Sequence, residues 1–176
     1  MSREPTPTQT VGPFFEIGFR WMHAPQVVED TCACAITIEG RVTDGNGDGI
    51  PDAVVEIFGA DQEGRFGNEA EKGWGGFGRC LSEDDGAYHF VTVKPGSVEK
   101  GSAPHLDVSV FCRGLLRRLV TRCYFSDETE ANSADALLLE MDAQRAKTLV
   151  ATKTGENTYS FDLHLQGDEE TAFFAW

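Results

Sequence analysis

The chain of 176 residues has few basic residues and no long apolar run, and both absences exclude classes of function. Its 15 lysines and arginines face 29 aspartates and glutamates, which gives a formal net charge of −14. Such a surface repels a phosphate backbone, so DNA or RNA binding is excluded. Because no apolar run reaches about 18 residues and residues 1–9 lack a basic segment followed by an apolar one, we expect no membrane span, no secretion signal and a cytoplasmic location.

Several catalytic motifs are also missing. The sequence contains no serine-nucleophile motif, no phosphate-binding glycine loop and no dinucleotide fingerprint. Three of its four histidines lack any partner at metal-ligand spacing, so we expect them at the surface or in packing: His23, His89 and His164. The tyrosines fall within predicted strands, where aromatic residues are common, and are expected to be core or cross-strand residues: Tyr88, Tyr124 and Tyr159.

The cysteines form no Cys-x-x-Cys pair, and their number is odd: Cys32, Cys34, Cys80, Cys112 and Cys123. Free cysteines are usually buried, and disulfides are rare in intracellular proteins. We therefore predict free, mostly buried thiols rather than a disulfide framework.

What the sequence does contain is a series of short strand patterns separated by turn residues. The composition, 40% hydrophobic and 25% charged, is typical of one globular domain. The predicted strands are 34–40, 54–58, 87–93, 106–112, 118–125, 148–152, 158–165 and 171–174. Residues 64–78 read as a long glycine-rich loop, and 126–141 as the one helical segment, with Ser126 or Asp127 as its N-cap. This pattern predicts an all-β fold, a β-sandwich of mostly antiparallel strands.

The first thirty residues differ from the rest. Prolines and threonines favour extended backbone there, so we predict an extended N-terminal arm over 1–30 and a β-sandwich domain over 31–176. Phe14 and Phe15 follow the rigid bend at Gly12-Pro13. These aromatic side chains either dock on another molecule or pack on the arm's own domain.

Two segments carry metal-ligand types. The run Asp44-x-Asn46-x-Asp48-Gly49 begins like a calcium loop, but Val55 stands where an EF-hand needs a carboxylate, which favours a polar hairpin turn over a calcium-stabilised β-domain. The second segment reads His105, Leu106, Asp107 on a predicted strand, where residues i and i+2 share a face. A His-x-His pair there could bind iron, but here the second position is a carboxylate. Taken alone, His105 is more simply a structural residue.

An ordered set of motifs resembles the intradiol ring-cleavage dioxygenases over nearly the whole chain, from Thr6 to Trp176. No one motif is decisive, but their order and spacing together are specific. The motifs are Thr8-Gln9-Thr10-Val11-Gly12-Pro13-Phe14, Gly40-Arg41-Val42-x-Asp44, Val55-Glu56-Ile57, Gly78-Arg79, Gly86-Ala87-Tyr88-x-Phe90-x-Thr92-Val93-Lys94-Pro95-Gly96, Ala103-Pro104-His105 and Thr121-Arg122-x-Tyr124-Phe125.

The resemblance implies a β-sandwich and a hetero-oligomer of alpha and beta chains. In the beta chain, two tyrosines and two histidines hold Fe(III), whose preference for hard phenolate oxygens suits that set. It also implies cleavage of protocatechuate by O2 to 3-carboxy-cis,cis-muconate.

This sequence departs from the family's iron site at nearly every position. Val98 stands where one tyrosine belongs, and the loop around residues 68–73 contains no tyrosine where the other belongs. His105 matches the first histidine, Asp107 replaces the second, and Ser102 replaces an arginine. We therefore predict that this chain holds no metal and no catalytic residue, and that the iron belongs to the partner chain.

The resemblance implies instead that this chain borders the active site of its partner. It places Thr10, Gly12 and Pro13 near the substrate, with Arg113 within reach of the pocket. Gly12 allows close approach to an aromatic ring, and Arg113 could attract a carboxylate that the net charge repels. A surface or interface salt bridge is the alternative for Arg113. For the whole chain the alternative is a non-enzymatic β-sandwich module for binding or assembly.

Overall fold

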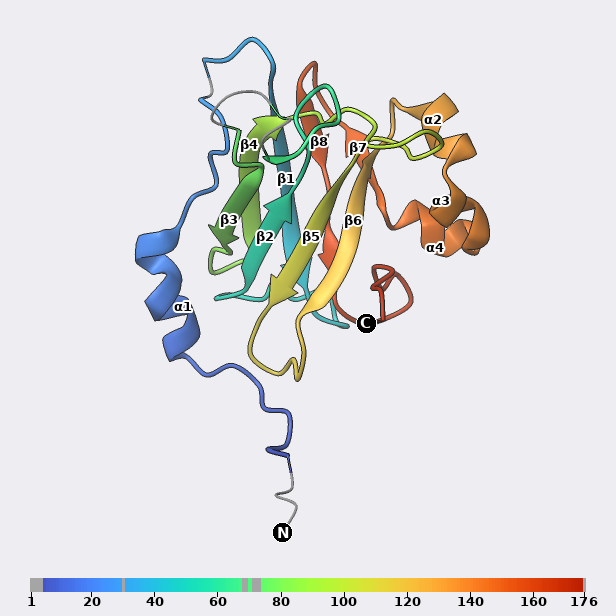
Figure 1. Cartoon of the computed structure of the whole chain (residues 1–176). Helices are drawn as coiled ribbons and strands as arrows, with labels where there is room; N and C mark the ends of the chain where they lie inside the picture. Colours follow the sequence, from blue (N-terminus) through green and yellow to red (C-terminus); the bar gives the residue numbers. More distant parts are fainter. Residues whose placement is uncertain (1–4, 30, 68–69, 71–73, 176) are drawn as a thin grey trace.

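The computed structural model describes residues 5–29, 31–67, 70 and 74–175. In this part of the chain the strands form one nine-stranded sheet in the order β3-β2-β5-β6-β7-β8-β1-β4, with β9 paired to β1. The sheet curls, and the short helices lie outside it (Figure 1). The strands are β1 (Ala35–Thr43), β2 (Val54–Phe58), β3 (Phe77–Leu81), β4 (Ala87–Val93), β5 (His105–Phe111), β6 (Leu119–Phe125), β7 (Val150–Lys153), β8 (Thr158–Ser160) and β9 (Leu163–His164).

The two halves of the curled sheet face each other across one core. Side chains alternate along β5, where Leu106, Val108 and Val110 are buried while His105 and Asp107 lie on the outer face. The same core takes residues from the opposite half, such as Ile38 of β1 and Phe90 of β4. Most strand pairs are antiparallel, whereas β1 with β8 and β9, and β6 with β7, are parallel. The predicted all-β architecture is thus confirmed, with β7 joining the two halves.

Some predicted element boundaries are wrong. The predicted strand 158–165 breaks into β8 and β9 because the Asp162 side chain accepts the backbone N–H of Arg41, at 2.9 Å, where a ladder carbonyl would otherwise stand. Residues 171–174 form no strand. Hydroxyl groups hold them instead, since Thr148 Oγ1 accepts from Ala172 N and Thr121 Oγ1 donates to Ala172 O.

Strand β3 was not predicted, and its first two residues fall at the end of the predicted glycine-rich loop. It pairs with β2 along its whole length. A Cβ added at Gly78 would lie 3.1 Å from both Ile57 and Phe90, so this glycine serves close packing within the sheet. The expected helical segment 126–141 is also divided, into α2 (Thr129–Ala134) and α3 (Ala136–Glu140), and is followed by α4 (Ala143–Lys147). The predicted N-cap is wrong, because Glu128 holds that position in α2.

The N-terminal arm is not extended throughout. Residues 14–22 form α1 (Phe14–Phe19) and the 3-10 helix η1 (Arg20–Met22). Pro13, with φ −63°, presets the backbone for the first turn, and the Glu16–Arg20 pair, at 2.6 Å, supports it. Phe15 packs on Phe111 of β5, with ring centroids 5.8 Å apart.

The helical part of the arm therefore has two apolar faces. Phe15 and Phe19 turn toward the sheet, where the Arg79 guanidinium lies 4.4 Å from the Phe19 ring centre. Phe14, Ile17 and Trp21 stay exposed, at 80%, 52% and 81%. The arm thus packs on its own domain with one face and leaves the other uncovered in the isolated chain.

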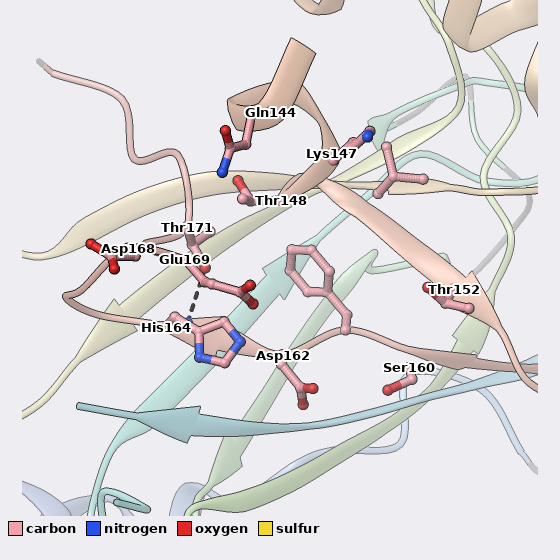
Figure 2. Close-up of a pocket in the computed structure, with 12 residues that line it drawn as sticks. Gln144, Lys147, Thr148, Thr152, Ser160, Asp162, His164, Asp168, Glu169 and Thr171 are labelled. Carbon is pink, nitrogen blue, oxygen red and sulfur yellow. Dashed lines mark hydrogen bonds between the residues drawn. The ribbon is translucent and has the colours of Figure 1, made fainter. Parts of the chain in front are cut away.

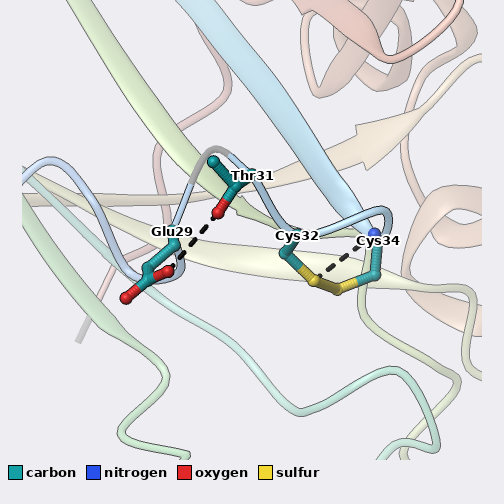
Figure 3. Close-up of a disulfide and its surroundings, with 4 residues drawn as sticks. All are labelled: Glu29, Thr31, Cys32 and Cys34. Carbon is teal, nitrogen blue, oxygen red and sulfur yellow. Dashed lines mark hydrogen bonds between the residues drawn. A yellow bond between two sulfur atoms is a disulfide. The ribbon is translucent and has the colours of Figure 1, made fainter.

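The prediction of five free thiols is wrong for two of them. Cys32 and Cys34 form a disulfide in the turn before β1 (Figure 3). The turn, in which Ala35 N donates to Cys32 O, brings their Cα atoms to 5.2 Å, within the range that a disulfide spans. The prediction of free buried thiols is confirmed for Cys80, Cys112 and Cys123.

The candidate calcium segment is a polar turn. Asp44 Oδ1 accepts from the backbone of Asn46 and Asp48, at 2.8 and 3.0 Å, and Val55 is fully buried in β2. Among the residues that the structure describes, no helix has the length and apolar character needed to cross a membrane.

Candidate functional site

The arm and the turn between β5 and β6 meet at the end of these two interior strands, where the arm runs past the turn (Figure 1). Thr10 Oγ1 accepts a hydrogen bond of 2.8 Å from Gly114 N, the residue after Arg113. Gly114 has φ +94°, a left-handed conformation that glycine adopts without strain. Two of the segments predicted from the sequence to border a substrate therefore lie side by side.

Gly12 and Pro13 lie at the start of α1 on the same stretch of arm. Gly12 O accepts a hydrogen bond of 3.0 Å from Phe15 N at the first turn of α1. No described atom lies within 4 Å of a Cβ added at Gly12. The backbone of Gly12 is therefore accessible to another molecule.

Arg113 is half-exposed and forms an ion pair within the chain. Its Nη2 lies 2.5 Å from Asp52 Oδ2, with side-chain exposures of 54% for Arg113 and 18% for Asp52. Sequence reasoning offered a surface salt bridge as the alternative for Arg113 but did not identify Asp52. The register of β2 and β5 could have identified Asp52 as the partner of Arg113. Val54 and Phe111 form the last pair of this ladder, and Asp52 and Arg113 lie two residues beyond it.

The arm and the turn enclose a small pocket of about 130 Å³, lined by Gln9, Val11, Phe111, Cys112, Leu115, Leu116, Arg117 and Arg118. Pockets that bind small molecules usually measure about 300–1,000 Å³. The pocket is thus too small to be a complete substrate site, and the surface beside it is one wall of a larger site at most.

The position of the family's iron ligands holds a structural network instead. His105 Nδ1 donates to Ala103 O at 2.8 Å, and its ring packs against Tyr124. Asp107 forms an ion pair with Arg122, whose Nε lies 3.2 Å from Asp107 Oδ1. Val98, 43% exposed, offers no ligand atom. The loop position of the second tyrosine falls mostly on residues 68–69 and 71–73, outside the described residues.

The residues present do not fit an iron centre. Within the described ranges, no group of three or more histidine, cysteine, aspartate or glutamate side chains could hold a metal ion. Burial and the nearby Arg122 cation lower the pKa of His105, which favours a neutral ring whose Nδ1–H is already used. The buried Asp135 carboxylate beside it accepts from Ala103 N and from the first turn of α3, so this corner is held together by structural hydrogen bonds.

A pocket of about 540 Å³ lies on the outer face of β5 and β6 next to this network. It is lined by Phe58, Asp107, Ser109, Arg118, Val120, Arg122, Leu137, Phe174 and Ala175. The Asp107–Arg122 pair lies in its wall. One carboxylate and two guanidinium groups against apolar side chains suit a small anion better than a cation.

A third pocket, of about 370 Å³, lies between α4, β8 and β9 and the C-terminal segment (Figure 2). Its acidic residues, Asp162, Asp168 and Glu169, outnumber its single lysine, Lys147. His164 on its floor is held by Thr43 Oγ1, at 2.8 Å from Nδ1, and by Thr171 Oγ1, which accepts its backbone N–H. This pocket disfavours an anionic ligand, and its histidine has a packing role, as predicted.

The chain is similar in sequence to known dioxygenases. The family model described as "Dioxygenase" matches residues 22–167. The protocatechuate 3,4-dioxygenase alpha chain of Burkholderia cepacia is 36% identical over 96% of this chain and 96% of its own length. The protocatechuate 3,4-dioxygenase beta chain of the same organism is 28% identical over 77% of this chain and 66% of its own length.

A solved structure supports the fold. The dioxygenase domain of a dioxygenase–carbohydrate-binding fusion protein from Streptomyces sp. SirexAA-E superposes with a TM-score of 0.66 at 22% identity, covering 96% of this chain and 100% of that one. At this identity the likeness concerns the fold alone. The family model and the alpha-chain relative go further, because together they span nearly all of the sequence. The chain therefore belongs to the intradiol dioxygenase family.

Proposed function

We propose that this chain is the iron-free alpha subunit of a protocatechuate 3,4-dioxygenase, in which a beta chain holds Fe(III) and carries out the ring cleavage by O2. The chain contributes one wall of the partner's active site, built from Thr10, Gly12, Pro13 and Arg113. The product is 3-carboxy-cis,cis-muconate. The 36% identity to an alpha chain over 96% of both sequences supports this assignment.

The observation that carries the proposal is a contrast between two regions of the chain. The corner that matches the family's iron ligands is filled by hydrogen bonds and an ion pair among Ala103, His105, Asp107 and Arg122. At the opposite end of β5, the Thr10–Gly114 contact holds the arm beside Arg113 and leaves both partly open. The chain thus lacks the catalytic ligands but presents a binding surface.

In this role the residues of the chain bind and orient the substrate. The guanidinium of Arg113 attracts the substrate carboxylate, which the net charge of −14 would otherwise repel. Gly12 permits close approach of backbone to the flat aromatic ring, and Pro13 keeps the bend rigid. Iron in the partner supplies the activation of the catechol, and no residue of this chain donates to that metal.

Reconstitution tests the proposal. The chain is purified alone, assayed for iron and for ring cleavage of protocatechuate, and then mixed with a protocatechuate 3,4-dioxygenase beta chain. We expect the isolated chain to contain no stoichiometric iron and to cleave no substrate. We expect the mixture to form a hetero-oligomer with ring-cleaving activity well above that of the beta chain alone.

The beta chain with bovine albumin in place of this chain is the matched control. Stoichiometric iron in the isolated chain would refute the proposal. Failure of the two chains to associate would also refute it, and would favour the non-enzymatic binding module.

A further inference from the structure

We propose that Asp52 is a positioning residue that fixes the guanidinium of Arg113 for the carboxylate of the substrate. The inference rests on the proposed function, since it concerns the same wall of the active site. It adds a residue that no family motif identifies. Four features of the structure carry it: strand register, a clamped loop, the difference in exposure between the two side chains, and two nitrogens of Arg113 that no described residue engages.

The pairing of Asp52 with Arg113 follows from the register of the sheet. Val54 of β2 pairs with Phe111 of β5 in an antiparallel ladder. Continuing both strands by two residues beyond this pair brings Asp52 opposite Arg113. The ladder ends at the Val54–Phe111 pair, and the Asp52–Arg113 ion pair lies two residues beyond it, where both strands have passed into turns.

The backbone around Asp52 is held from both sides by one serine. Ser82 Oγ donates to Ile50 O at 2.8 Å and accepts from Ala53 N at 2.9 Å, while Ser82 N donates to Ala53 O. Asp52 itself has φ +61°, and among the described residues it is the only one other than glycine in the left-handed region. Aspartate and asparagine tolerate this conformation better than most residues.

The two partners differ in exposure, which assigns their roles. Asp52 is only 18% exposed and sits on the clamped loop, whereas Arg113 is 54% exposed and lies in the turn. The less exposed carboxylate is therefore the fixed partner, and the arginine is the one that is oriented. Without the Asp52 carboxylate, the flexible Arg113 side chain would have many competing partners on a chain with 29 acidic residues.

Asp52 leaves part of the arginine free. The ion pair uses Nη2 of Arg113, and no hydrogen bond joins Nε or Nη1 to any described residue. A guanidinium has five N–H donors in a planar fork, so one edge can stay on Asp52 while another meets a carboxylate. The bond from Gly114 N to Thr10 keeps the arm beside this fork.

The test measures kcat and KM for protocatechuate in the complex reconstituted with the beta chain. Asp52→Asn removes the charge but keeps a side chain suited to the left-handed backbone. We expect a KM increase of about fivefold with kcat within about a factor of two, as for loss of one partly screened charge-assisted contact. Inhibition by catechol, which lacks the carboxylate, should not change.

A double-mutant cycle isolates the coupling. Arg113→Ala should raise KM by about tenfold, and adding Asp52→Asn to it should raise KM no further, because Asp52 acts through Arg113. Asp85→Asn removes an equal charge from the more distant Arg41 pair and serves as the control, with no expected change in KM. Melting temperatures of the variant chains verify that each is folded.

The possible results separate the inference from the proposed function. If Arg113→Ala raises KM while Asp52→Asn leaves it unchanged, the positioning role of Asp52 is wrong and the substrate role of Arg113 stands. If Asp52→Asn weakens catechol inhibition as much as protocatechuate binding, its effect is general damage and the inference fails. If Arg113→Ala itself changes nothing, both roles fall, although the assembly with the beta chain is unaffected.

Discussion

At the scale of single residues, the corner that matches the family's iron ligands is occupied by structural contacts. Asp107 lies opposite Arg122 in the β5–β6 register, so replacing a histidine by a carboxylate creates a cross-strand ion pair. His105 lies opposite Tyr124 in the same ladder, and the two rings pack together. These contacts help to hold β5 and β6 together.

The contribution of His105 to the stability of the isolated chain should fall as the pH drops from 7 to 5. Burial lowers the pKa of His105 in the folded state below its usual value near 6.5. The unfolded chain then binds the proton first, so acidification favours unfolding. We expect His105→Gln to flatten the dependence of the unfolding free energy on pH in this window, measured by urea denaturation.

His23 should contribute to the same slope, because burial also lowers its pKa. The comparison is therefore between the variant and the wild-type chain, and some slope should remain in the variant. An unchanged slope in His105→Gln would show that His105 titrates equally in both states.

At the scale of elements, the arm is the segment whose structure suits a partner. Trp21 and Phe14 are the most exposed large apolar side chains among the described residues, and they lie on the outer face of α1 and η1. They follow directly after Gly12 and Pro13. We infer that this face covers part of the beta chain next to the proposed active-site wall.

We expect Trp21→Ser to weaken association with the beta chain by about tenfold or more, as for loss of a large aromatic anchor. The melting temperature of the isolated chain should not change, because the side chain is 81% exposed. Sedimentation or light scattering of the mixed chains measures the effect. The control is Leu139→Ser, which removes a similarly exposed apolar side chain, 67%, from α3. Equal effects of the two substitutions would contradict a specific role for the arm.

The elements also show how far the sequence alone could lead. Strands β2 and β4 have the predicted bounds because turn residues flank a continuous apolar or alternating run. Strand β3 was missed because its glycine at position 78 signals a loop, whereas here it permits close packing against Phe90. Helix α1 was missed because the prolines before it suggested extended backbone. The break between β8 and β9 depends on one side-chain acceptor, Asp162, which no local pattern reveals.

The candidate site was also predicted from the sequence only in part. The ordered motifs drew attention to Thr10, Gly12, Pro13 and Arg113, and the contact of Thr10 with Gly114 places two of these segments together. Asp52 could not be found in the same way, because its relation to Arg113 exists only through the register of two strands. Substrate roles for all of these residues remain proposals.

At the scale of the whole molecule, the dominant property is the net charge of −14. Like charges repel one another in the compact state, and salt screens this repulsion. Salt also weakens exposed ion pairs such as Arg41–Asp85, but each of these pairs adds little to the free energy of unfolding. We therefore expect the melting temperature of the isolated chain to rise by a few degrees when sodium chloride increases from about 10 to 300 mM.

Calorimetric scans at several salt concentrations measure this rise, and potassium chloride should give the same result. Calcium and magnesium chloride at matched ionic strength should also agree with each other, since the Asp44 carboxylate already serves the backbone of its turn. A melting temperature that falls with salt would mean that local ion pairs outweigh the net repulsion.

The sheet order has a consequence for how the chain is made in the cell. Strand β1 precedes the other strands, yet its parallel partners β8 and β9 follow all of them in the sequence. Until they emerge from the ribosome, one edge of β1 has no ladder partner, and nascent chains carry an open strand edge prone to aggregation. Completion of the sheet therefore waits until β8 and β9, which end at His164, have emerged. A chain that stops before β8 retains the arm and the β5–β6 turn in sequence but lacks two of the strands that complete the sheet.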